Sequence, residues 1–82
     1  MQIVWDEFKR ETNIAKHGMD FAALTVEFFE TAEIEEAKQD RFLAVGELEG
    51  VTIIAVVFRP LGSEALSVIS MRRASKAERN RS

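Results

Sequence analysis

The sequence predicts an α+β fold in which two N-terminal helices pack on a small antiparallel β-sheet and a short helix ends the chain. Two observations predict this class. Helical patterns with capping residues gather in the first third of the chain, and apolar runs separated by short turns fill most of the rest. Helices that mostly precede strands are typical of α+β domains. With 82 residues, we expect one domain over residues 1–82 with a single modest core.

The central strand is predicted over Val51–Arg59, which is almost uninterruptedly apolar and rich in β-branched residues. A strand with one solvated face alternates apolar and polar residues, so this run indicates a strand that is covered on both faces. Gly50 precedes the run, and Pro60–Ser63 has the composition of a turn. We therefore expect the chain to reverse at Pro60, with the last helix or a partner covering the second face.

Neighbouring strands are predicted on both sides of this run. Arg41–Gly46 leads into it through a hairpin at 47–50, and Ala65–Met71 returns after the Pro60 turn, which makes an antiparallel meander. Residues 32–38 fit either a polar edge strand or a helical continuation. The edge strand is favoured because charged residues protect an exposed edge. Gln2–Val4 is a short extended start.

The first helix is predicted to begin at Asp6, a good N-cap, and to end at Gly18, which suits the left-handed position after a helix. Phe8, Thr12 and Ala15 fall on one face of that helix.

Asp20 is the predicted cap of the second helix. Its apolar stripe, expected to pack on the sheet, consists of Phe21, Leu24, Phe28 and Phe29. The spacing of Ser75 and Glu78 is that of a capping box, so a short terminal helix is predicted to begin at Ser75.

Composition excludes several classes of site. The chain has no cysteine and one histidine, so neither a thiolate nor a histidine zinc site is expected, and no segment has the spacing of a calcium loop. We expect no metal and no cofactor. No apolar run approaches the length of a membrane span, and the first residues lack the pattern of a signal peptide. A cytoplasmic location is the default expectation.

The net charge of -3 conceals an uneven distribution. Residues 27–40 hold six acidic side chains and one lysine, whereas residues 72–81 hold five basic side chains and one glutamate. A basic end of this kind fits a phosphate polymer or an acidic partner, and a solvated helix explains it equally well.

Arginines are the first candidate functional residues. Arg41 begins one predicted strand and Arg59 ends its neighbour, so both fall at the same end of their hairpin, while Arg72 and Arg73 leave the last strand toward the opposite end. Arginine binds phosphate through two hydrogen bonds and stabilises the extra negative charge of a phosphorus transition state. A surface or salt-bridging role also explains each of these arginines, and for Arg59 it is the favoured one.

His17 is the candidate for proton transfer, because histidine is the residue type that most readily exchanges a proton near neutral pH. Capping the end of the first helix explains the same residue. Lys9 and Lys16 are two helical turns apart on one face, where they could contact a phosphate backbone or simply face solvent. These residues alone indicate a cationic surface without a specific catalytic signature.

The chain resembles the BrnT toxins of type II toxin–antitoxin modules. The resemblance begins with Trp5-Asp6, Lys9, Asn13, Lys16-His17-Gly18 and Phe21, which match the signature W-D-x-x-K-x-x-x-N-x-x-K-H-G-x-x-F. It continues through Phe29, Arg41, Gly46, Val56-Val57-Phe58, Ile69-Ser70-Met71-Arg72-Arg73-Ala74 and Glu78-Arg79.

This resemblance implies a RelE-like fold and a metal-independent endoribonuclease that blocks translation by cutting mRNA, with or without the ribosome. It also implies a BrnA-type antitoxin as partner. In that case the toxin contacts DNA only indirectly, because the antitoxin is the DNA-binding component. On this resemblance Arg41 and Arg72 are the expected transition-state clamps and His17 the expected proton-transfer group. The expected substrate contacts are Lys9, Lys16, Arg59 and Arg73.

The alternative is a catalytically weak or inactive homologue that binds an antitoxin and takes part in transcriptional autoregulation. It arises because Ser67 stands where the family usually has a basic residue, and Phe58-Arg59 where it often has tyrosine and threonine. Arg59 is a candidate to supply the charge that Ser67 lacks.

Overall fold

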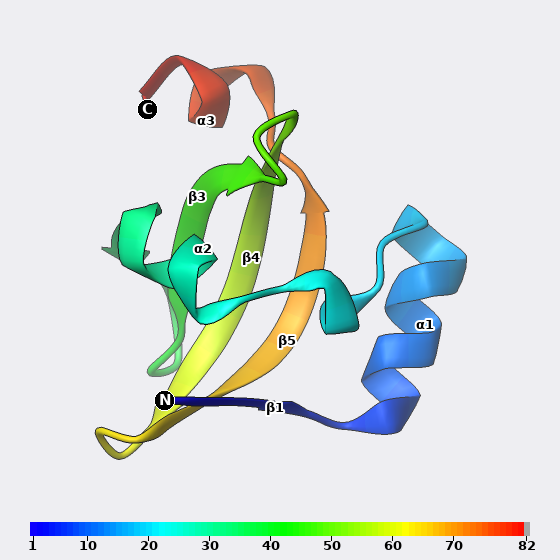
Figure 1. The fold of residues 1–82 in the computed structure, drawn as a ribbon, viewed down its shortest axis with the longest axis vertical. Coiled ribbons are helices and arrows are strands. Elements are labelled where there is room, and N and C mark those ends of the chain that lie inside the picture. Colours follow the sequence, from blue (N-terminus) through cyan, green and yellow to red (C-terminus); the bar gives the residue numbers. More distant parts are fainter. Residues whose placement is uncertain (82) are drawn as a thin grey trace.

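The computed structural model describes residues 1–81. Its elements follow in the order β1 (Gln2–Trp5), α1 (Glu7–His17), the 3-10 turn η1 (Phe21–Ala23), α2 (Val26–Thr31), β2 (Glu33–Glu36), β3 (Phe42–Leu48), β4 (Thr52–Leu61), β5 (Ala65–Arg73) and α3 (Lys76–Arg81). The strands form one sheet in the order β1-β5-β4-β3-β2, with helices around it (Figure 1). The α+β class and the central place of β4 are therefore confirmed.

The sheet is mixed, so the prediction of an antiparallel sheet is wrong in one respect. Strand β1 pairs parallel to β5, with Ile3 opposite Leu66. A parallel pair needs a long connection between its strands, and here everything from α1 to β4 supplies it. The prediction considered only consecutive strands joined by short turns, and it left the extended start without a partner.

The ends of α1 are those that the sequence predicts, but its buried face is different. The Asp6 carboxylate accepts a hydrogen bond from the Phe8 backbone N–H at 2.8 Å, and Gly18 ends the helix with φ of 68°. The expected face of Phe8, Thr12 and Ala15 is exposed. The buried residue of α1 is Asn13.

The predicted second helix is broken into η1 and α2. Asp20 caps only the short 3-10 turn, and Thr25 then caps α2 by accepting a hydrogen bond from the Phe28 N–H at 3.2 Å. Thr25 is in the extended conformation, which interrupts the helix between the two pieces. The apolar stripe of the prediction is nevertheless buried throughout, because both pieces lie against the sheet.

The larger core cluster lies on the sheet face that α2 and η1 cover. Its buried members are Phe21, Leu24, Phe28, Phe29, Ala44, Ile54, Val56, Phe58, Leu66, Val68 and Met71. Gly46 permits this packing, because a Cβ at that position would stand 3.2 Å from the Phe28 ring and 3.1 Å from Ala32. The opposite face carries a small cluster of Val45, Ala55 and Ala74. Ala74 immediately precedes Ser75, the capping residue of α3.

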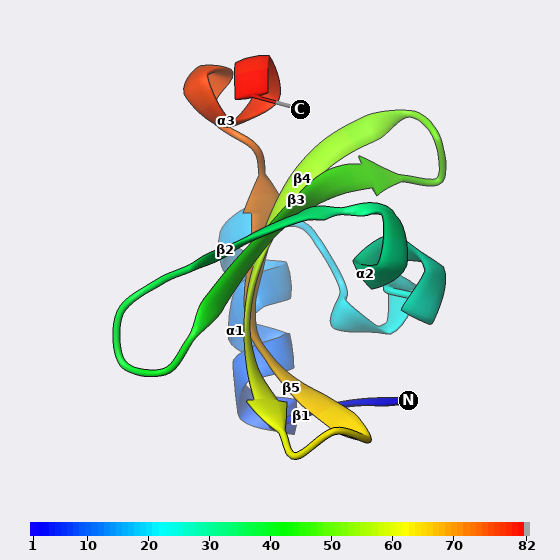
Figure 2. The same cartoon turned by 90° about the vertical axis from the view of Figure 1, so that its left-hand side faces the viewer.

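Figure 2 shows α2 on one side of the sheet and the tip of the β2–β3 hairpin projecting to the other. The edge strand favoured for residues 32–38 is present as β2. The turns at the two ends of β3 each contain two adjacent residues with positive φ, Gln39–Asp40 and Glu49–Gly50. Positive φ at both central residues is typical of type I′ hairpin turns.

Strand β4 continues through Pro60 to Leu61, so the predicted reversal at Pro60 comes later, at Gly62 with φ of 65°. The pairing with β3 ends at Phe58, which makes β4 locally an edge strand at Pro60. A proline without an N–H is tolerated on such an edge.

The terminal helix begins as predicted. The Ser75 hydroxyl accepts a hydrogen bond from the Glu78 N–H at 3.2 Å, and the Glu78 carboxylate accepts one from the Ser75 N–H at 2.8 Å. This reciprocal pair is a capping box. None of the helices in residues 1–81 is long and apolar enough to span a membrane.

Candidate active site

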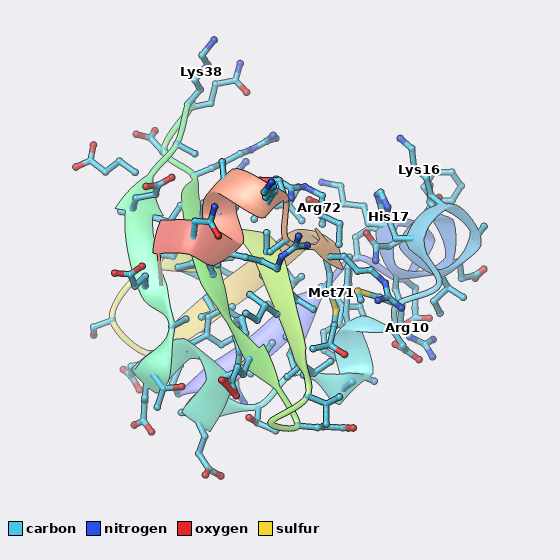
Figure 3. The ribbon with its side chains drawn as sticks, turned by 90° about the horizontal axis from the view of Figure 1, so that it is seen from above. Arg10, Lys16, His17, Lys38, Met71 and Arg72 are labelled. Carbon is cyan, nitrogen blue, oxygen red and sulfur yellow. The ribbon has the colours of Figure 1, made fainter. Side chains whose placement is uncertain are left out.

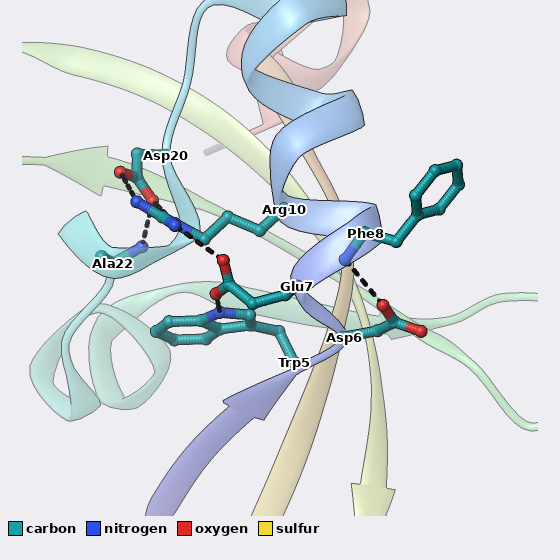
Figure 4. Close-up of polar contacts among 7 residues, drawn as sticks. All are labelled: Trp5, Asp6, Glu7, Phe8, Arg10, Asp20 and Ala22. Atoms are coloured by element: carbon teal, nitrogen blue, oxygen red, sulfur yellow. Dashed lines mark hydrogen bonds and ion pairs between the residues drawn. The ribbon is translucent and has the colours of Figure 1, made fainter.

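Several residues of the N-terminal signature have structural roles. The Trp5 ring packs edge-on against Phe21, with centroids 6.2 Å apart, and its indole N–H donates to Glu7 Oε1 at 2.9 Å. Arg10 then joins Glu7 to Asp20, donating to the Asp20 carboxylate at 2.7 and 2.9 Å (Figure 4). The Arg10 guanidinium and the Ala22 N–H lower the pKa of Asp20 to about 2. This network fixes the start of α1 against η1.

Asn13 attaches α1 to β5. Its amide nitrogen donates to the carbonyls of Met19 at 3.0 Å and Met71 at 2.9 Å, and its carbonyl accepts from the Met71 N–H at 3.0 Å. The side chain is 5% exposed, so these hydrogen bonds are shielded from water. Asn13 therefore acts as a clamp that sets the distance and register between the helix and the strand.

The remaining signature residues, Lys9, Lys16 and His17, lie together in a hollow between α1 and β5. This α1–β5 groove has a volume of about 220 Å³. It is lined by Phe8, Lys9, Thr12, Asn13, Lys16, His17, Ile69 and Ser70. No carboxylate is among these residues, whereas each of the four other hollows described includes at least one. In a chain of net charge -3, this groove is a local concentration of cations.

Ile69 enters the groove through an irregularity in β5. Val57 pairs with Ser70 and Phe58 with Val68, so Ile69 has no partner opposite it on β4. Such a bulge bends the strand and redirects the extra side chain, and bulges are over-represented beside active sites. The groove thus has an apolar contribution from each wall, Phe8 from α1 and Ile69 from β5.

Arg72 lies beside the C-terminal end of this groove, although it is not among the residues that line it. From the contact between Asn13 and Met71, α1 and β5 continue in the same direction (Figure 1). His17 is then about 6 Å farther along the helix, and Arg72 is about 3 Å farther along the strand. Figure 3 shows Arg72 between α3 and the end of α1 that carries Lys16 and His17.

The guanidinium of Arg72 is held by α3. It donates to both carboxylate oxygens of Glu78, at 2.8 and 3.0 Å. This bidentate pair raises the pKa of Arg72 and, together with the Ser75 N–H, lowers the pKa of Glu78 to about 2. The pair links the end of β5 to α3. Arg72 therefore has a structural role, independent of any role in catalysis.

Arg41 and Arg59 lie in a different hollow. This hairpin-end hollow, of about 750 Å³, is lined by Glu36, Ala37, Gln39, Asp40, Arg41, Phe42, Arg59 and Pro60. Phe42 pairs with Phe58, so the two arginines share one end of the β3–β4 hairpin, as expected. The Arg41 Nε is buried and makes no hydrogen bond within residues 1–81. Arg73 is exposed at the opposite end, beside Ile54.

The register separates Arg41 from Arg72. Arg72 pairs with Ala55, which pairs with Val45, and Arg41 is four residues before Val45 on the chain. That corresponds to about 13 Å along the strand and about 10 Å across two strand spacings. The structure thus brings together Lys9, Lys16 and His17, with Arg72 adjacent, and keeps Arg41 with Arg59 elsewhere.

Sequence reasoning gave a site role to Lys9, Lys16 and His17 but not to the other residues that line the groove, which are Phe8, Thr12, Asn13, Ile69 and Ser70. The sequence places Phe8 on one helical face with Thr12 and Ala15, and the Asn13 clamp shows that this face is exposed and that part of it lines the groove. The bulge at Ile69 depends on strand register, which no local pattern encodes. Within residues 1–81, no group of three His, Asp or Glu side chains is arranged to hold a metal ion.

Comparisons with known proteins identify the family. A family model described as the ribonuclease toxin, BrnT, of type II toxin–antitoxin systems matches residues 5–78. The chain belongs to this family. It is also similar to the Brucella abortus ribonuclease toxin BrnT, known from a 1.1 Å crystal structure, with 63% sequence identity and a TM-score of 0.88. That match covers 93% of this chain and 99% of the Brucella chain. No curated protein matches the chain.

Membership of the BrnT family accounts for the signature residues and for the mixed five-stranded sheet. It makes the chain a ribonuclease toxin of a type II toxin–antitoxin system, with RNA as substrate and an antitoxin as partner.

Proposed function

We propose that the chain cleaves RNA in the α1–β5 groove by a RelE-like, metal-independent reaction in which the RNA supplies its own nucleophile. A base removes the proton of a 2′-hydroxyl, and that oxygen attacks the adjacent phosphorus in line. The bond to the 5′-oxygen breaks, and an acid protonates the leaving oxygen. The products are a 2′,3′-cyclic phosphate and a 5′-hydroxyl. This scheme needs cations on the phosphate and at least one proton-transfer group.

One observation carries the proposal. The signature residues Trp5, Asp6, Asn13, Gly18 and Phe21 all have structural contacts, whereas Lys9, Lys16 and His17 are exposed and line one groove without a carboxylate. Within residues 1–81, the side chains of these three residues form no ion pair or hydrogen bond. They are therefore available to a phosphate backbone.

The roles follow from position. His17 is the proton-transfer group, Lys9 and Lys16 hold the backbone, and Arg72 stabilises the charge that develops on the phosphoryl oxygens at the end of the groove. Arg41 and Arg59 contact a separate phosphate at the hairpin-end hollow, since they lie two strand spacings away from Arg72. Arg73, exposed at the end of β5, is a further backbone contact.

In the cell, cleavage of mRNA, free or on the ribosome, would stop translation in the cytoplasm. A BrnA-type antitoxin would suppress this activity, and the complex would reach DNA only through the antitoxin. The second candidate function is that of a non-catalytic antitoxin partner in autoregulation. The bidentate Arg72–Glu78 pair favours it, because that arginine already has a carboxylate ligand.

Cleavage of a labelled RNA in the presence of EDTA tests the proposal and separates the two candidates. Wild-type protein should leave 2′,3′-cyclic phosphate ends, and His17→Ala should lower the rate about 100-fold or more. Lys38→Ala is the matched control, because Lys38 is an exposed cation at the far tip of the β2–β3 hairpin (Figure 3). Undiminished cleavage by His17→Ala would remove the proposed proton-transfer role. Antitoxin binding without any cleavage would establish the non-catalytic function.

A further inference from the structure

Phe8 is the most exposed aromatic side chain of the chain, and the structure gives it no packing role. The Phe8 side chain is 77% exposed. By contrast Trp5, which immediately precedes the capping residue Asp6, packs against the core. Figure 4 shows its ring pointing away from the Trp5–Glu7–Arg10–Asp20 network. An exposed phenylalanine costs free energy in water, so a ligand that covers the ring would recover it.

The surroundings of Phe8 select the class of that ligand. Phe8 shares the α1–β5 groove with Lys9, Lys16 and His17, and the groove contains no carboxylate. An apolar ring beside cations suits a molecule that is both planar and anionic. Single-stranded nucleic acid meets both conditions, since its bases stack on aromatic rings while basic side chains follow its phosphates.

We propose that Phe8 stacks on one nucleobase of the RNA and so positions the strand in the groove. Ile69, the bulge residue of β5, contributes apolar surface from the opposite wall of the same groove. The Asn13 clamp holds the two walls at a fixed distance, so the base site is preformed. This inference rests on the proposed RNA cleavage in that groove and adds a base-binding residue to it. Phe8 is a positioning residue and takes no part in proton transfer.

Binding to an RNA analogue that cannot be cut tests the inference separately from cleavage. The probe is a short, fluorescein-labelled 2′-O-methyl oligoribonucleotide, which lacks the nucleophile, and the readout is fluorescence anisotropy. Phe8→Ala should weaken binding about tenfold, which is within the range found for loss of one stacked base. Phe8→Trp should retain affinity, and Phe8→Leu should lose most of it because an aliphatic side chain has no aromatic face. Ile14→Ala is the matched control, since Ile14 is an exposed apolar residue of α1 that does not line the groove.

An abasic scan along the same oligonucleotide provides the decisive arm. At one position, loss of the base should weaken wild-type binding to the level of Phe8→Ala, and it should leave Phe8→Ala itself unaffected. Unchanged RNA affinity of Phe8→Ala would overturn the inference. The inference would also fail if every abasic substitution weakened RNA binding by wild-type protein and by Phe8→Ala to the same extent. A defect confined to the antitoxin complex would assign Phe8 to a protein interface instead. Because the probe cannot be cleaved, failure of the His17 experiment and failure of this one are distinguishable.

Discussion

The two main cationic hollows of this toxin differ in what surrounds the cations. In the α1–β5 groove, Lys9, Lys16 and His17 are exposed and no carboxylate lines the wall. In the hairpin-end hollow, Arg41 and Arg59 share the wall with Glu36 and Asp40. Local carboxylates reduce the attraction that a cation exerts on a phosphate. This difference supports the proposal that the substrate's reacting phosphate binds in the α1–β5 groove, although the presence of two arginines would favour the hairpin-end hollow.

The largest effect is expected from loosening the wall of the groove without touching its cations. Asn13→Ala removes three hydrogen bonds and leaves the buried N–H and C=O of Met71 without partners. We expect the free energy of unfolding to fall by about 3 kcal/mol. Urea denaturation followed by the fluorescence of Trp5, the single tryptophan, measures it.

Thr12→Ala is the control for this prediction, because Thr12 is the exposed neighbour that also lines the groove. It should change stability by less than about 0.5 kcal/mol. Equal stabilities of the two variants would show that Asn13 does not clamp α1 to β5.

A second prediction uses pH to weaken the Arg72–Glu78 pair at the end of the groove. The pKa of Glu78 is about 2 in the folded protein, below the ordinary value of 4.5. The unfolded chain therefore binds more protons between these values, so stability from this group is complete above pH 4.5 and is lost as the pH falls toward 2. The loss should be about 1–2 kcal/mol, since Arg72 is partly exposed.

Urea denaturation at a series of pH values measures this loss. Glu78→Gln should show a flatter profile than wild type below pH 4.5, with the contribution of Asp20 remaining. Glu30→Gln, an exposed glutamate on α2, should follow the wild-type curve. A Glu78→Gln profile as steep as that of wild type would contradict the ion-pair account.

The smallest effects are expected when cations are removed in pairs from each hollow. Lys9→Ala with Lys16→Ala should weaken single-stranded RNA binding about tenfold and reduce its logarithmic salt dependence by about 1.4, or about 0.7 for each phosphate contact. Arg41→Ala with Arg59→Ala should weaken binding only about threefold, because Glu36 and Asp40 already offset their charge. Filter binding over a range of salt concentrations compares the pairs. A larger loss of RNA affinity in the arginine double variant than in the lysine double variant would place the main phosphate contacts at the hairpin end.

Local rules of chain geometry predicted much of the fold. Asp6 and Gly18 bound α1, Ser75 with Glu78 starts α3, and the apolar run around Val56 forms the central strand. Each of these features depends on residues within a few positions of each other. The break at Thr25 is also a local feature, since Thr25 caps α2. It was not predicted, because the apolar stripe continues on both sides of Thr25 and indicates one uninterrupted helix.

Long-range features were not predictable in this way. The parallel pairing of β1 with β5 and the Asn13–Met71 clamp join residues more than 50 positions apart. That clamp rotates α1 so that Phe8 faces solvent, the reverse of what its apolar character indicates. The candidate cations were predictable by residue type and by resemblance, yet their division into two hollows depends on strand register. Only the sheet shows that Arg41 and Arg72 are far apart.

The most direct test of the α1–β5 groove as the RNA site is an amide chemical-shift titration with a 2′-O-methyl oligoribonucleotide. We expect the largest shifts at Phe8–His17 and at Ile69–Arg72, with small shifts at the hairpin end. Shifts centred on Glu36–Phe42 and Arg59, with α1 unaffected, would contradict the assignment and make the hairpin-end hollow the substrate site.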